Sequence, residues 1–122
     1  MDLTAKLQIK PGQTVAFVGV PDGMPPLADS VNPAAGPDTA DAVIAFVRNK
    51  AELGTGADAA IAAARLDRLA WIAYPKAGKL GTDLNRDILA ALVTERGVQP
   101  VRQIAIDETW SALRFRPALP TA

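Results

Sequence analysis

Three unbroken apolar runs predict the strands at the centre of the fold. They cover residues 14–20, 41–47 and 69–74. An apolar run without polar alternation is typical of a strand buried on both faces, as strands of parallel sheets usually are. Two further runs, at 101–106 and 112–116, are separated by a connection of hairpin length. We therefore expect five strands in one sheet.

Apolar residues at helical spacing predict a helix over residues 83–96, with Thr82 as its N-cap. Two capping-box patterns follow the second strand, so a helix is expected to begin near Lys50 or to restart near Gly56. A short helix is expected over residues 2–9. Helices between the strands are typical of an α/β fold.

Proline divides the chain without separating domains. Half of the 10 prolines lie in residues 21–40, where such density excludes long regular elements. We interpret this segment as an ordered loop within one domain over residues 1–122, because the flanking strands are too short for separate domains. Two further prolines predict a frayed tail at 117–122.

The order of these elements predicts a three-layer, Rossmann-like α/β fold with a mostly parallel five-stranded sheet. The first four strands would run parallel, and the fifth would enter antiparallel near an edge through a C-terminal hairpin. This topology resembles a shortened class I methyltransferase fold. The Gly-x-Gly turn of those enzymes is missing after residues 14–20, and the Pro-rich residues 21–40 replace the segment that would hold adenosine. We expect no cofactor, and at most weak binding of S-adenosylmethionine.

Composition and charge exclude several function classes. The chain is 49% hydrophobic and 21% charged, and 13 basic residues balance 13 acidic ones. Zero net charge argues against nucleic acid or an anionic membrane as partner. The chain has no Cys and no His, which excludes thiol nucleophiles, Ser-His-Asp triads and Cys or His metal ligands. We expect a cytoplasmic protein, because no apolar run approaches the ~20 residues of a membrane span.

Several short motifs resemble a family of small bacterial proteins known as domain of unknown function 3052. They are Trp71 with Pro75-Lys76, the segment Thr82-Asp83-Leu84, and Asp107-Glu-Thr-Trp-Ser111. The resemblance spans nearly the whole chain. It implies no activity, because the family has no established one.

Loops that follow parallel strands meet at one edge of a sheet, where ligands of open α/β sheets bind. Lys76 and Lys79 precede a predicted helix start, so they form either an anion site or an ordinary solvated loop. Asp83 and Asp107 could hold Mg²⁺ if they converge, or could serve as structural caps. Trp110 either covers the strand ends or stacks on a planar ligand. The candidate ligand-binding residues are Lys76, Lys79, Thr82, Asp83, Asp107, Glu108 and Trp110.

Two functions follow from these residues. The first is a binding or interaction module for a partner protein or a small anion, with no metal. The alternative is a small enzyme that uses Lys76, Asp83 and Asp107 at the strand-end crevice, with Mg²⁺ as a candidate ion. The sequence leaves the partner unknown and a homo-oligomer open.

Overall fold

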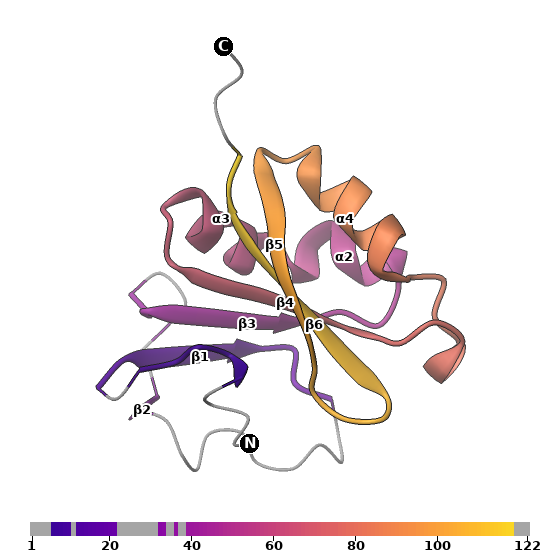
Figure 1. Ribbon diagram of the computed structural model, residues 1–122, viewed down its shortest axis with the longest axis horizontal. Coiled ribbons are helices and arrows are strands. Elements are labelled where there is room, and N and C mark those ends of the chain that lie inside the picture. The colour runs from indigo at the N-terminus through magenta and orange to yellow at the C-terminus, as the bar shows by residue number, and fades with distance from the viewer. Residues whose placement is uncertain (1–5, 11, 22–31, 34–35, 37–38, 119–122) are drawn as a thin grey trace.

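The computed structural model describes residues 6–10, 12–21, 32–33, 36 and 39–118. Its strands form one sheet in the order β2-β1-β3-β4-β6-β5 (Figure 1). All five predicted strands are present, although several begin or end at other residues, and the two-residue β2 was not predicted. The strands are β1 (Thr14–Val18), β2 (Asn32–Pro33), β3 (Ala42–Phe46), β4 (Leu69–Pro75), β5 (Val98–Ala105) and β6 (Trp110–Pro117).

The sheet is mixed. β2, β1, β3 and β4 pair parallel in that order, as the apolar runs of the last three predict. β6 then lies between β4 and β5 and pairs antiparallel with both. Because β5 and β6 are long, the two antiparallel pairings join more residues than the three parallel pairings do. The predicted mostly parallel sheet is therefore wrong.

The helices are α2 (Lys50–Gly56), α3 (Asp58–Arg65) and α4 (Arg86–Thr94), and a 3-10 turn, η2, covers Lys79–Gly81. The Asn49 side chain accepts a hydrogen bond from the Glu52 backbone N–H at 2.9 Å, so α2 starts at the first predicted cap, while the Glu52 carboxylate accepts from the Arg48 N–H instead of that of Asn49. The predicted restart is also present, but Ala57 rather than Thr55 precedes α3.

The two faces of the sheet carry separate cores, because successive side chains of a strand point to opposite sides. On one face, Val43, Ala45, Ile72 and Phe115 pack with helical residues such as Leu53, Ile61 and Leu89; we call this the helix-side core. On the other face, Ile44, Phe46, Trp71, Trp110 and Ala112 pack with Leu7 and Ile9; we call this the outer core.

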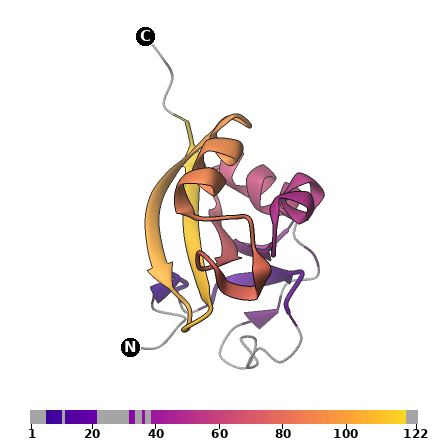
Figure 2. The same cartoon turned by 90° about the vertical axis from the view of Figure 1, so that its right-hand side faces the viewer.

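The predicted three-layer arrangement is also wrong. Each of α2, α3 and α4 contributes to the helix-side core, and they lie together on one side of the sheet (Figures 1 and 2). The outer core is covered by the N-terminal segment that carries Leu7 and Ile9. Of residues 21–40, the structure describes only residues 21, 32–33, 36 and 39–40, and these contain no helix. The fold is α/β but not Rossmann-like.

Some expectations fall outside the described residues. The predicted N-terminal helix over 2–9 lies mostly there; within the description, Lys6 is helical and the chain turns at Leu7 and Gln8. Most of the Pro-rich loop at 21–40 and most of the tail at 117–122 also lie outside.

The clearest helix starts later than predicted, at Arg86 rather than Asp83. Asn85 is its N-cap, and the Asn85 Oδ1 accepts from the Ile88 backbone N–H at 2.8 Å. The Thr82 hydroxyl instead accepts from the Leu84 N–H at 3.0 Å, within the turn that precedes the helix. A side chain that satisfies a first-turn N–H stabilises a helix by about 1 kcal/mol.

We expect Asn85→Ala to lower the free energy of unfolding by about 1 kcal/mol, because it leaves a first-turn N–H of α4 without its acceptor. Thr82→Ala removes only a turn hydrogen bond and should cost less. Urea denaturation of both variants, followed by circular dichroism, tests the assignment. A larger loss for Thr82→Ala would mean that the helix begins at the earlier residue.

Candidate functional site

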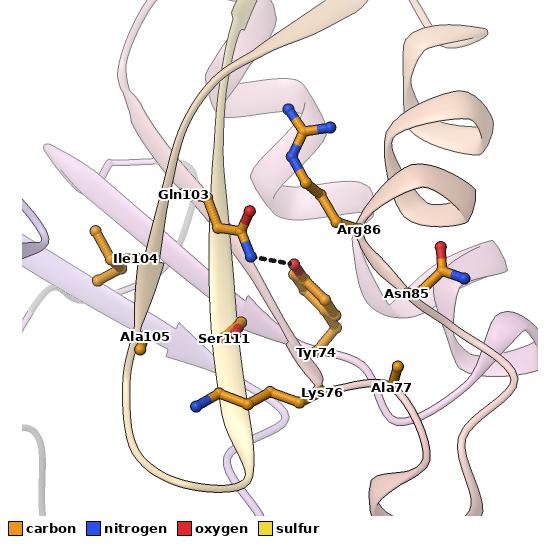
Figure 3. Close-up of a pocket in the computed structure, with 9 residues that line it drawn as sticks. All are labelled: Tyr74, Lys76, Ala77, Asn85, Arg86, Gln103, Ile104, Ala105 and Ser111. Atoms are coloured by element: carbon orange, nitrogen blue, oxygen red, sulfur yellow. Dashed lines mark hydrogen bonds between the residues drawn. The ribbon is translucent and has the colours of Figure 1, made fainter.

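A cavity of about 520 Å³ opens on the helix side of the sheet (Figure 3). It lies where the end of β4, the β5–β6 hairpin and the N-terminus of α4 meet. Its lining therefore combines residues that are far apart in the chain. They are Tyr74, Lys76, Ala77, Asn85, Arg86, Gln103, Ile104, Ala105 and Ser111.

Two buried hydroxyl groups line the inner part of this pocket, and the side-chain amide of the exposed Gln103 reaches one of them. Tyr74 and Ser111 are neighbours in the β4–β6 register, and both are at least 96% buried. The Gln103 side-chain amide donates to the Tyr74 hydroxyl at 3.1 Å (Figure 3). Because that oxygen already accepts this hydrogen bond, the phenolic O–H can donate to another group.

Burial raises the pKa of Tyr74 above the usual value for a phenol, whereas the nearby Arg86 charge and the hydrogen bond with Ser111 oppose the shift. The phenol therefore remains protonated throughout the physiological range and acts as a neutral hydrogen-bond donor.

Two cations flank these neutral donors. Lys76 follows β4, and its backbone N–H donates to the Thr109 carbonyl at 2.7 Å, which ties the start of this loop to the hairpin turn. Its ammonium forms no ion pair with the residues described. Arg86, the first residue of α4, pairs with the exposed Asp87 at 3.2 Å. Such an exposed pair contributes little to stability and leaves the guanidinium able to bind a ligand.

No acidic side chain is among the lining residues described. The pocket therefore presents two positive charges together with amide and hydroxyl groups. Ala77 and Ala105 add apolar wall, whereas Ile104 lines the cavity with its side chain packed on the outer core. This combination suits an anion that carries a small organic body.

The predicted site residues separate into two groups. Of the lysines, Lys76 lines the pocket, whereas Lys79 lies exposed in η2. Thr82 belongs to the turn before α4. The Asp83 Oδ1 accepts from the Lys50 backbone N–H at 2.9 Å and so connects this turn to the start of α2. Lys76 alone among these four lines the cavity.

The hairpin residues of the predicted site hold the turn between β5 and β6. The Asp107 Oδ1 accepts from the backbone N–H groups of Thr109 and Trp110, at 2.8 and 2.7 Å. Glu108 is exposed at the turn. The Trp110 ring is buried in the outer core against Phe46, with centroids 5.5 Å apart at 75°. This ring packs on the face opposite the helices, so it forms no part of the pocket.

The carboxylates proposed for Mg²⁺ both accept backbone hydrogen bonds. Asp83 binds the start of α2 and Asp107 binds its own turn. Within the described ranges, no three acidic side chains come together as a metal site would require. The structure gives Asp83 and Asp107 the capping roles that were the alternative interpretation.

Three important pocket residues were not candidates in the sequence. They are Tyr74, Arg86 and Gln103. The apolar run 69–74 ends on Tyr74, a side chain with a polar tip, and this was the available signal for one of them. Gln103 could be found only with the strand register, because its contact with Tyr74 crosses β6.

Comparison with known proteins identifies no family for this chain. No family model, curated protein or solved structure matches the chain. The resemblance to domain of unknown function 3052 stays a prediction. None of the described helices has the length and apolar character needed to cross a lipid bilayer.

Proposed function

We propose that the chain is a binding module for a small organic anion, held in the pocket between β4, β5, β6 and α4. The observation that carries this proposal is that Lys76 and Arg86 both line the cavity and that its described lining contains no carboxylate. Charge-assisted hydrogen bonds from ammonium and guanidinium groups are the stronger class of polar contact to an oxyanion.

The size and walls of the pocket favour a ligand larger than a bare inorganic ion. A volume of about 520 Å³ lies within the range of small-molecule sites. A phosphate or carboxylate group would accept from Lys76 or from Arg86, whose charged ends lie on different sides of the Tyr74–Gln103 hydrogen bond (Figure 3). The Tyr74, Ser111 and Gln103 side chains would bind hydroxyl or amide groups of the ligand, and Ala77 and Ala105 would contact its apolar part.

Binding is favoured over catalysis by the chemistry of the lining. The chain has neither Cys nor His, and the described lining has no carboxylate to act as a general base. The Tyr74 phenol is held protonated by burial, which makes it a poor nucleophile. Groups that donate hydrogen bonds are abundant in the described lining, and the adjacent Asp87 carboxylate is paired with Arg86 at 3.2 Å.

Lys76→Ala is expected to weaken phosphate binding by about tenfold, because it removes a charge-assisted hydrogen bond from the pocket. Lys79→Ala is the matched control, since it removes an equal charge three residues along the same loop, outside the cavity. Titration with inorganic phosphate and with citrate, followed by amide chemical shifts, measures both affinities.

Shifts should map to the residues around the pocket, and Lys79→Ala should bind within about twofold of the unchanged protein. Equal losses in both variants would indicate weak attraction to a lysine loop, and the pocket proposal would then be wrong. Unchanged affinity in Lys76→Ala with shifts elsewhere would also contradict it.

A further inference from the structure

A second cluster of charge lies on the opposite face of the β5–β6 hairpin. The two strands contain three arginines and no acidic residue. Arg102 stands directly opposite Arg114 in the register, and Arg116 lies two residues further along β6. Leu113 and Phe115 of β6 belong to the helix-side core, so the alternating Arg114 and Arg116 point to the outer face. We call Arg102, Arg114 and Arg116 the arginine face.

The charges of the arginine face are only partly compensated. Arg116 forms a two-pronged ion pair with Asp67, through Nε and Nη2 at 3.0 Å each. The Arg114 Nη1 donates to the Gln8 side-chain oxygen at 2.6 Å, a neutral partner. Arg102 is exposed and forms no hydrogen bond or ion pair within the described ranges.

Arg114 has a further unsatisfied group. Its Nε is buried and has no hydrogen-bond partner. Burial lowers the pKa of Arg114, and the charges of Arg116 and Arg102 add to this effect while Asp67 opposes it. Like charges directly opposite in an antiparallel pair destabilise a sheet. An unpartnered buried donor beside such a pair calls for an explanation of its own.

Protection of a sheet edge does not explain this arrangement. Charged residues on an edge strand commonly prevent it from pairing with another chain. Arg114 and Arg116 alternate with apolar residues, as the charged residues of such a strand would. The structure instead places β6 inside the sheet, between β4 and β5. Arg102 alone lies on the edge strand, so the other two arginines have no edge to protect.

We propose that the arginine face binds an acidic segment of a partner protein. Cross-strand neighbours such as Arg102 and Arg114 are about 5 Å apart, and residues two apart on a strand about 7 Å. Acidic side chains two residues apart on an extended segment are also separated by about 7 Å. β5 is the last strand of the described sheet, so an extended segment can also lie along its outer edge. The zero net charge of the chain disfavours nucleic acid as the occupant.

The test uses fluorescein-labelled octaglutamate as the probe and fluorescence anisotropy as the readout. We expect binding that weakens as salt is added, because Arg102 and Arg116 are exposed to solvent. Arg102→Ala should weaken this binding by about tenfold. Arg102 is chosen over Arg114 because it is exposed and holds no other described group, so the fold is preserved.

Arg48→Ala is the matched control. Arg48 is exposed, pairs with Glu52 at 2.8 Å and lies outside the hairpin, and its loss changes the net charge equally. This variant should bind octaglutamate within about twofold of the unchanged protein. Equal weakening in both variants, or no binding of octaglutamate, would overturn the proposal. Tighter binding of a thymidine oligonucleotide of equal charge would also overturn it, in favour of nucleic acid. The Lys76→Ala variant should bind octaglutamate normally, so the outcome is independent of the pocket.

Discussion

Replacing Trp71 with Ala is expected to lower the free energy of unfolding by about 4 kcal/mol. Trp71 is fully buried in the middle of β4, where Ile44 and Arg114 are its neighbours on the adjacent strands. Its indole N–H donates to the Leu7 carbonyl at 2.9 Å. The ring therefore fills the outer core and also holds the N-terminal segment that covers it. The substitution removes both contributions and leaves a cavity.

Trp71→Phe separates packing from the hydrogen bond. It keeps an aromatic ring in the outer core and leaves the Leu7 carbonyl without its donor, so we expect a smaller loss of about 2 kcal/mol. Urea denaturation, followed by circular dichroism, measures both variants. A loss below about 1 kcal/mol for Trp71→Ala would mean that the N-terminal segment does not pack on this face as described.

The apolar runs predicted the strands because a strand that is buried on both faces has apolar residues at nearly every position. β3 and β4 are buried at every position, and both occur close to the predicted bounds. The layers could not be predicted in the same way. Whether the second face of a strand meets a helix or an extended segment depends on the chain that crosses it, and here Leu7 and Ile9 supply that cover.

The helix start at Asn85 shows how tertiary contacts decide between equal local signals. Thr82 and Asn85 are both suitable N-cap residues, and the sequence alone favoured the first. In the structure, Asp83 binds the start of α2 and Leu84 is buried in the helix-side core. These contacts hold the intervening residues in an irregular turn, so the helix begins at the later cap.

The pocket was predictable only at its loop. Lys76 was a candidate because it follows a buried strand, where ligands of α/β sheets bind. The other polar lining residues include Arg86 of α4 and Gln103 of β5. No sequence spacing relates Tyr74 to Gln103. Their contact depends on the insertion of β6 between β4 and β5. The same insertion puts Arg114 and Arg116 on an interior strand, next to Arg102 of β5, so one topological feature positions both proposed sites.

Gly19→Ala is expected to lower the free energy of unfolding by about 3 kcal/mol, from two separate costs. Gly19 follows β1 with φ of +71°, in the left-handed region that a side chain disfavours. A Cβ at this position would also lie 2.9 Å from the Phe46 carbonyl oxygen, a backbone atom of the adjacent β3. Gly19 therefore serves both as a turn residue and as a point of close packing between β1 and β3.

Gly78→Ala isolates the first of these costs. Gly78 has φ of +80°, but a Cβ there would have no atom within 4 Å. We expect this control to lose about 1 kcal/mol, since only the backbone strain applies. Urea denaturation of the two variants gives the difference directly. Because β1 and β3 are paired along four residues, relief of the Gly19 contact requires the two strands to separate at their ends. Equal losses for Gly19→Ala and Gly78→Ala would show that these ends yield freely, and that the close approach of β1 and β3 contributes nothing to stability.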